Sequence, residues 1–343
     1  MNNLFSISIA KWKYNKTWVY SATYDEALSD LYKFVIPLHD QLGIPGHVEV
    51  VSGHIGEIRN IGASSYNGMK HMDASELKDI ISRGWGVGCH SWSHGTVMDN
   101  PELELKVAKE KLESTIGRRV TIYTSPGSNV NLTKEVIEKA KEYGYLAGMS
   151  ITDNLNYCDS EDLFWINRPP LHEKFSDLYD SAFDAFKRIH QAKKYNGWVV
   201  DYLHCPLETA IHDYKDCSAA HHKERLQTIQ EEGRYDCWFA NPDDVVDYRY
   251  MHRHTKLDGD ITKDNEITIR LNDLPEQVIN RELTFILKCA YTPEALKIAV
   301  DDNITYAVPA GGGCLSFTAW VKDGSKIKFI PKIMKSQNNK IPK

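Results

Sequence analysis

The sequence predicts an α/β protein, a distorted (β/α) barrel of about seven strands followed by a C-terminal β-sandwich. Up to about residue 250, short β-rich runs alternate with helical patterns, which is typical of parallel strands joined by helical crossovers. From about residue 255, strand-like runs follow one another with turns between them and no helical segment, which is typical of a sandwich. We therefore expect a catalytic domain over residues 1–254 and an accessory domain over residues 255–343.

Length and composition indicate a folded protein of two domains, without a nucleic-acid partner or a membrane span. A chain of 343 residues exceeds the size of most single cores, which favours two domains. The 41 basic and 47 acidic residues give a net charge of -6 without a basic stripe, so we expect no nucleic-acid partner. No apolar run reaches the roughly eighteen residues that a membrane span needs. Seven cysteines without paired C-x-x-C spacing, and a signal peptide that is absent or trimmed, favour a cytoplasmic protein over a secreted one.

The first barrel strand is expected over residues 17–24, and an amphipathic helix over residues 27–42 follows it. Asp25 and Glu26 stand at the junction of these two elements. In a (β/α) barrel this junction, after the C-terminal end of a strand, is where active-site residues lie.

The next helix has clear end signals. Asp73 is the expected N-cap, Glu76 is its capping-box partner, and Gly84 ends the helix. A short strand over residues 85–89 follows, and His90 comes directly after it. A second polar candidate thus follows the end of a strand.

The same alternation continues to about residue 250. Ser125-Pro126-Gly127 follows one expected strand and His204 follows another, so further candidates also stand at strand ends. The expected elements are a helix over residues 100–117, a strand over 119–124, a helix over 134–144, a strand over 145–149, a helix over 176–195, a strand over 198–203 and a last short helix opened by Asn241-Pro242.

His90 and His94 are candidate metal ligands. Two imidazoles four positions apart on a helical turn point to one place and supply two ligands to one ion. With 14 histidines in 343 residues, chance alone gives about 0.6 such pairs, so the spacing is informative only with further ligands nearby.

Asp25 and Glu26 supply the carboxylates that such a site needs. A catalytic zinc-type ion takes about three protein ligands and leaves a position for water, and a second carboxylate must accept the proton that the water loses. Adjacent residues at a strand end point in different directions, so one carboxylate can face the ion and the other its water. The alternative is that the pair only caps the following helix.

From about Trp18 to Tyr250 the chain resembles the polysaccharide deacetylases of carbohydrate esterase family 4, the NodB-homology type. Five motifs in the order and spacing of that family carry the resemblance. They are Thr23-Tyr24-Asp25-Glu26, His90-Ser-Trp-Ser-His94, Tyr123-Thr-Ser-Pro-Gly-Ser-Asn129, Tyr202-Leu203-His204 and Cys237-Trp-Phe-Ala-Asn-Pro-Asp-Asp-Val-Val-Asp-Tyr248.

The resemblance implies a metal-dependent hydrolase that removes acetyl groups from the N-acetylated amino sugars of a poly- or oligosaccharide. Asp25 would be the general base and His204 the general acid. Glu26, His90 and His94 would hold a divalent cation, expected to be Zn, with Co, Ni or Mn as alternatives. The groove would be lined by Tyr123, Ser125, Pro126, Gly127, Arg168 and Trp92.

Two departures from the family pattern leave alternatives open. Glu26 stands where the family usually has Asp, and Thr124 stands where the family commonly has an Arg that orients the base. One alternative is that Arg168 fills the orienting role from another loop. The other is that the substrate is not an N-acetylated sugar but a different amide or an O-acetyl ester. A glycan-binding descendant without activity is the remaining alternative. For two single residues the alternatives are structural: His204 would be a core histidine, and Trp92 would be a scaffold aromatic.

Overall fold

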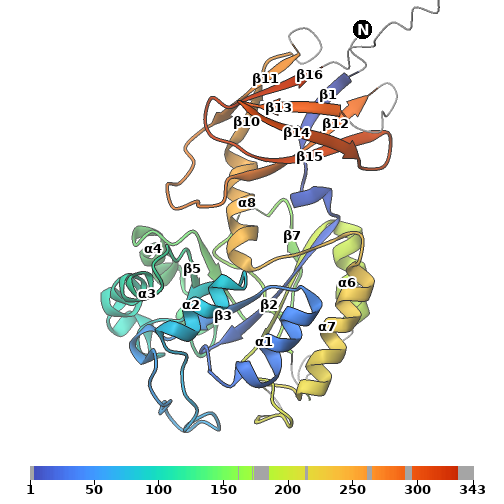
Figure 1. Cartoon of the computed structure of the whole chain (residues 1–343). Coiled ribbons are helices and arrows are strands. Elements are labelled where there is room, and N and C mark those ends of the chain that lie inside the picture. The colour runs from blue at the N-terminus through green and yellow to red at the C-terminus, as the bar shows by residue number, and fades with distance from the viewer. Residues whose placement is uncertain are drawn as a thin grey trace, which may run out of the picture. The chain divides into compact units, whose positions relative to one another are not determined.

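The computed structural model describes residues 4–160, 162–171, 173, 185–212, 215–260, 265–289 and 296–330. The chain divides into two compact units, Lys16–Arg249 and a second unit that joins the residues up to Asn15 to those from Tyr250 onward. This division differs from the boundary expected at residue 254. The reason is that β1 (Leu4–Ile9) pairs antiparallel with β12 (Glu282–Cys289), so the start of the chain belongs to the strand-rich unit (Figure 1).

The unit Lys16–Arg249 contains a largely parallel sheet with the order β6-β5-β4-β3-β2-β8-β7. All neighbours from β6 to β8 are parallel, β7 is antiparallel to β8, and β9 pairs in parallel with the first residues of β2. The strands are β2 (Trp18–Asp25), β3 (Gly46–Val50), β4 (Gly86–Cys89), β5 (Ile122–Thr124), β6 (Ala147–Met149), β7 (Asn156–Tyr157), β8 (Gly197–Leu203) and β9 (Cys237–Phe239).

An irregular segment crosses the gap between β6 and β8 and closes the sheet into a distorted barrel. Ile166 forms a parallel bridge with Met149 at the end of β6, and Pro170 forms a parallel bridge with Tyr202 in β8. Because these bridges are isolated, the closing segment is not a regular strand. The predicted distorted (β/α) barrel is confirmed.

Helices cover the outside of this sheet (Figure 1). They are α1 (Leu31–Leu42), α2 (Ala74–Ser82), α3 (Ala108–Ile116), α4 (Lys134–Glu142), α6 (Ala185–Tyr195), α7 (Ala219–Gly233) and α8 (Pro242–His254), the last of which runs past the end of the unit. Tyr24 of β2 shows how the helices attach, because its hydroxyl lies 2.7 Å from Nε2 of both His39 in α1 and His222 in α7. None of the helices in the described ranges is long and apolar enough to cross a membrane.

Several predicted helix ends are confirmed and others shift. The capping box of Asp73 and Glu76 at the start of α2 is present as predicted. The first helix begins at Leu31 and not at residue 27, because Glu26 and Ala27 have φ angles of 70° and 48°. The helix expected over 100–117 is a π-helical turn, Glu102–Val107, that continues into α3. Of the helix expected over 176–195, residues 176–184 lie outside the described residues.

The second unit is built of antiparallel strands in the order β1-β12-β15-β14-β13-β16-β11-β10. Burial alternates along several strands, and Phe285 of β12 stacks on its cross-strand partner Phe317 with ring centroids 5.0 Å apart. Alternating burial means that these strands hide one face, as predicted, while the sandwich arrangement stays a prediction. The remaining strands are β10 (Thr255–Asp258), β11 (Glu266–Leu271), β13 (Leu296–Val300), β14 (Asn303–Pro309), β15 (Cys314–Trp320) and β16 (Lys326–Ile330).

Candidate active site

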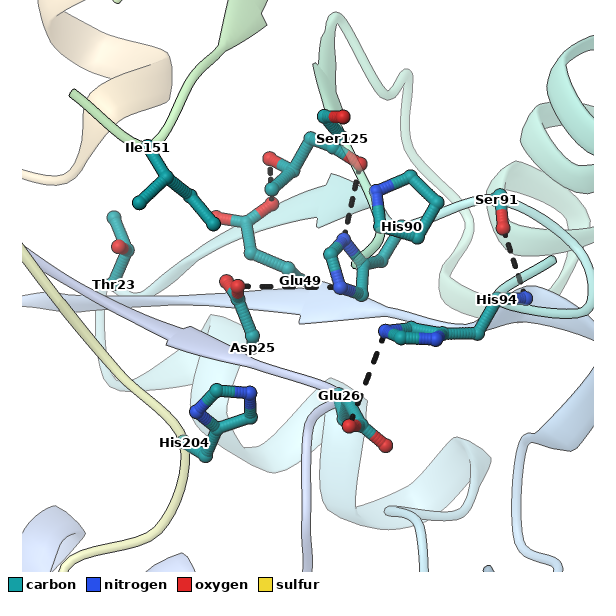
Figure 2. A network of polar contacts seen from close by, with 12 residues as sticks. Thr23, Asp25, Glu26, Glu49, His90, Ser91, His94, Ser125, Ile151 and His204 are labelled. Carbon is teal, nitrogen blue, oxygen red and sulfur yellow. Dashed lines mark hydrogen bonds and ion pairs between the residues drawn. The ribbon is translucent and has the colours of Figure 1, made fainter. Parts of the chain in front are cut away.

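Polar side chains follow the C-terminal ends of neighbouring barrel strands. Asp25 is the last residue of β2, Thr124 is the last of β5, and His90 and His204 directly follow β4 and β8. Because these strands are parallel, their ends meet at one rim of the barrel, where Figure 2 shows Asp25, His90 and His204 close together. The structure therefore brings together candidates that lie up to 179 residues apart in the sequence.

Asp25 is a buried carboxylate held by a buried arginine. Arg168 Nη1 donates to Asp25 Oδ1 over 2.8 Å and to the hydroxyl of Thr23 over 3.0 Å. Burial raises the pKa of Asp25, but the charge of Arg168 and weaker contributions from two histidines lower it below its ordinary value. Asp25 is thus an ionised carboxylate, and Arg168 holds it in place by a direct hydrogen bond that Thr124 does not supply.

The loop from His90 to His94 places two imidazoles side by side, with ring centroids 4.9 Å apart. The helical turn expected here is wrong, because Ser91 and His94 have φ angles of 65° and 62° and the segment is a bend. His90 Nδ1 lies 3.0 Å from the carbonyl oxygen of Thr124, which assigns the proton to Nδ1 and leaves a lone pair on Nε2. That Nε2 atom is 4.0 Å from Asp25 Oδ2.

Glu26 is bound by an arginine that the sequence did not single out. Arg59 donates to both carboxylate oxygens of Glu26, from Nη2 to Oε1 over 2.8 Å and from Nε to Oε2. Burial raises the pKa of Glu26, but the hydrogen bonds from Arg59 outweigh this and bring it to about 2. Glu26 is therefore an ionised carboxylate with a charged partner.

The donor types at this rim are those of a zinc-type site, two imidazoles and a carboxylate. Atoms that share such an ion at about 2.1 Å lie about 3.4 Å apart in a tetrahedron, whereas His94 Nε2 and Glu26 Oε1 are 4.0 Å apart. Within the described residues, no group of three or more His, Cys, Asp or Glu is arranged to hold a metal ion. The donor types thus fit a cation, but His94 and Glu26 would have to come closer together to share one.

His204 has an aromatic neighbour that fixes its ring. Tyr66 stacks on the imidazole at a centroid distance of 5.0 Å and an angle of 16°, and its hydroxyl donates to Asp216 Oδ2 over 3.2 Å. His204 Nδ1 lies 3.2 Å from the carbonyl oxygen of Lys215. Burial lowers the pKa of His204 below its ordinary value although the two nearby carboxylates oppose the shift. The imidazole of His204 is thus held by Tyr66 on one face and by the Lys215 carbonyl at Nδ1.

A second layer of charge lies inside the barrel beneath the rim. Glu49 accepts a hydrogen bond from the Thr124 hydroxyl over 2.6 Å and pairs with His47 Nδ1 over 2.6 Å. Burial lowers the pKa of His47, but Glu49 and Asp243 outweigh it and raise the pKa to about 9. Gly88 on the neighbouring strand makes room for this pair, because a Cβ there would overlap Oε2 of Glu49. Thr124 therefore links Glu49 to His90.

The residues expected to line the groove differ in exposure. Tyr123 is fully buried and its hydroxyl donates to the carbonyl of Asn131 over 2.9 Å, so it can meet a substrate only through its backbone. Ser125 and Pro126 are also buried, whereas Gly127 is exposed with a φ of 73°. Trp92 is partly buried against the barrel core, and its backbone N–H donates to Glu104 over 3.0 Å.

Three residues of this region were not among the candidates from the sequence. Arg59 and Tyr66 come from the long connection between β3 and α2, and Glu49 comes from β3, a strand that the sequence analysis did not identify. Of the three, Glu49 alone has a weak sequence signal, since residues 47–51 read His-Val-Glu-Val-Val, a β-branched run with alternating polar positions. Nothing local identifies Arg59.

Residues 14–148 match the family model described as polysaccharide deacetylase. The resemblance to polysaccharide deacetylases is thereby confirmed. The matched segment includes Asp25, Glu26, His90 and His94, whereas Arg168 and His204 lie beyond it. No curated protein matches the sequence.

Solved structures of deacetylases also resemble the chain. A protein of Mycobacterium smegmatis assigned to the polysaccharide deacetylases is 13% identical, with 73% of this chain and 96% of that chain covered and a TM-score of 0.47. The polysaccharide deacetylase Bc1974 of Bacillus cereus is 16% identical, with coverages of 65% and 91% and a TM-score of 0.40. The Streptococcus pyogenes deacetylase PplD, solved with acetate, is 15% identical, with coverages of 47% and 68% and a TM-score of 0.37.

Proposed function

We propose that this protein is a hydrolase that removes acetyl groups from the N-acetylated amino sugars of a poly- or oligosaccharide. The family match supports deacetylase chemistry in general. The observation that carries the specific proposal is the ionised carboxylate of Asp25, held by Arg168 and 4.0 Å from a histidine nitrogen at the barrel rim. The strand-rich unit is proposed to be an accessory module.

In the proposed reaction Asp25 acts as the general base. Its carboxylate takes the proton from the water that attacks the acetyl carbonyl, and Arg168 keeps it ionised and oriented for this step. A backbone N–H beside Tyr123 donates to the oxygen that becomes negative as the carbonyl is attacked. Burial of these groups strengthens both interactions, because water does not screen them.

His204 acts as the general acid. Its Nδ1 atom is bound to the carbonyl of Lys215, which leaves Nε2 to hold the proton that the departing amine needs. The stacked ring of Tyr66 keeps the imidazole in this orientation. Since burial lowers the pKa of His204, the protonated form needs the neighbouring carboxylates, whose charge raises that pKa.

We also propose that the site binds a divalent cation. Nε2 of His90, Nε2 of His94 and the carboxylate of Glu26 would hold it, with Zn favoured and Co, Ni or Mn as alternatives. When bound, such an ion polarises the acetyl carbonyl and lowers the pKa of water. The assignment to Glu26 requires that this carboxylate be shared with Arg59.

The experiment is an acetate-release assay on purified full-length protein. N-acetylated chitooligosaccharides should release acetate, and the Asp25→Asn variant should be slower by about 100-fold or more, as expected for loss of a general base. O-acetylated xylan and small N-acetyl amides in the same panel identify the alternative substrates. A protein that releases acetate from no member of the panel, with or without added Zn²⁺, would contradict the proposal.

The engagement of Glu26 by Arg59 favours one second candidate, a glycan-binding protein without activity. If the protein only binds glycans, wild type and the Asp25→Asn variant should both bind the oligosaccharide, and neither should release acetate from it. Isothermal titration with the same chitooligosaccharides, run beside the acetate assay, separates the two functions.

A further inference from the structure

Arg59 is held rigidly beside the proposed cation site. Its backbone N–H donates to the carbonyl of Met69 over 2.7 Å, and Gly68 donates back to the carbonyl of Arg59 over 2.9 Å. Its Nη1 atom donates to Asn67 Oδ1 over 2.6 Å. Only 4% of the residue is exposed, so the guanidinium is fixed from both its backbone and its side chain.

The position of Glu26 is fixed as well. Its φ of 70° places the residue in a left-handed turn, and its carbonyl oxygen lies 2.8 Å from Nδ1 of His71. The two bonds from Arg59 form a bidentate pair, the strongest arrangement for an arginine and a carboxylate. A cation that takes Glu26 as a ligand therefore meets a carboxylate that already has a positive partner.

The charges of the rim balance without an added ion. Asp25 and Glu26 carry two negative charges, and Arg168 and Arg59 carry two positive charges in direct contact with them. A divalent ion at this place would add two positive charges beside a buried guanidinium, which repels them.

We propose that Arg59 competes with a divalent cation for Glu26 and thereby weakens metal binding at His90 and His94. This inference rests on the proposed function, because it concerns the same cation. It goes beyond it by assigning a role to a residue outside all five motifs. The wild-type protein therefore binds the divalent cation weakly, and removal of the Arg59 guanidinium raises its affinity for that cation.

The test is a measurement of metal affinity that does not depend on activity. Metal-free wild type and the Arg59→Met variant are titrated with Zn²⁺ against a chromophoric chelator. The variant should bind at least about tenfold more tightly, because the carboxylate loses its competing partner. Arg59→Lys should lie between the two, since an ammonium cannot occupy both carboxylate oxygens as the guanidinium fork does. The control is Arg83→Met, which breaks a surface ion pair with Asp79 and should leave Zn²⁺ affinity unchanged.

A double variant localises the effect. Arg59→Met combined with His94→Ala should lose the gain in affinity, whereas a gain that survives would place the ion elsewhere and overturn the inference. Equal Zn²⁺ affinity in wild type and Arg59→Met would overturn the competition and leave the proposed cation site standing. Absence of binding in both would overturn the competition and the cation site together. If Arg59→Met does not fold, an affinity of Arg59→Lys equal to that of wild type overturns the inference.

Discussion

Arg168 donates a 2.8 Å hydrogen bond to Asp25, although the two residues lie 143 positions apart and come from different kinds of backbone. Asp25 ends the central strand β2, whereas Arg168 belongs to the irregular segment that closes the barrel between β6 and β8. The closing segment thus does more than complete the barrel, because it carries the Arg168 guanidinium, whose positive charge keeps the proposed base ionised.

Replacement of Arg168 by methionine should lower kcat for acetate release by about 100-fold or more, with a smaller effect on KM. The physical reason is that the base loses both its orientation and its stabilising charge. The matched control is Arg225→Met, which removes another buried arginine–carboxylate pair, Nε to Asp201 Oδ2 at 2.8 Å. Both variants should unfold at lower temperature, and an equal loss of kcat per folded molecule in the two would show that Arg168 is only structural.

Replacement of Tyr66 by leucine should lower kcat by about tenfold, because the imidazole of His204 loses the ring stacked on it and an aromatic pair contributes about 0.5–1.5 kcal/mol. Tyr66→Phe keeps the ring but loses the hydroxyl that donates to Asp216, and should therefore retain most of kcat. Steady-state kinetics on one N-acetylated oligosaccharide compares the two. Equal losses in both variants would assign the effect to the hydroxyl and not to the stacking.

The sequence was sufficient for the parts of the site that depend on strand ends. Asp25, His90 and His204 could be placed because each follows a recognisable strand, and parallel strands bring such positions to one rim. Arg168 could be named only as an alternative, because Thr124 stands where the family commonly has an arginine, and the segment that carries Arg168 has no hydrophobic period. The closing segment was not recognisable because isolated bridges leave no hydrophobic alternation.

Other parts of the site depend on contacts that no local pattern encodes. Arg59 meets Glu26 across 33 residues from a connection without regular structure, and a charged residue in such a connection normally faces solvent. The spacing of the histidine pair predicts a helical turn, whereas positive φ angles at Ser91 and His94 bring the two rings together in a bend. The sequence analysis did not identify β1, and its pairing with β12 depends on a strand partner far along the chain that no local pattern indicates.

The barrel should lose stability as the pH rises from about 6 to above 9, because His47 is paired inside it. Its pKa in the folded protein is about 9 against 6.5 in the unfolded chain, so its charged form stabilises the fold fully below pH 6.5 and this contribution is lost as the pH rises through 9. A shift of this size corresponds to about 3 kcal/mol. Urea unfolding of the barrel at pH 6 and pH 9.5 measures it.

The control for this prediction is His47→Gln, in which the group that titrates is removed while its place in the barrel stays filled. Its free energy of unfolding should change less between the two pH values than that of wild type. The groups that face His47 are Glu49 and Asp243, and Asp243 is also bound by Arg118 over 2.7 Å. An identical pH dependence in variant and wild type would show that another group is responsible.

Gly88→Ala should destabilise the barrel by about 1–3 kcal/mol, because the added methyl group would overlap the carboxylate of Glu49 and the neighbouring His47 ring in a closely filled interior. The displacement should also reach the rim, since Glu49 holds the hydroxyl of Thr124, whose carbonyl oxygen holds His90. Thermal unfolding and kcat are measured for Gly88→Ala, Glu49→Ala and the double variant. The overlap predicts coupling, so that removal of Glu49 costs less stability in the Gly88→Ala background than in wild type. Additive losses would mean that the alanine is accommodated without moving Glu49, and the link from barrel interior to rim would then have to run through other residues.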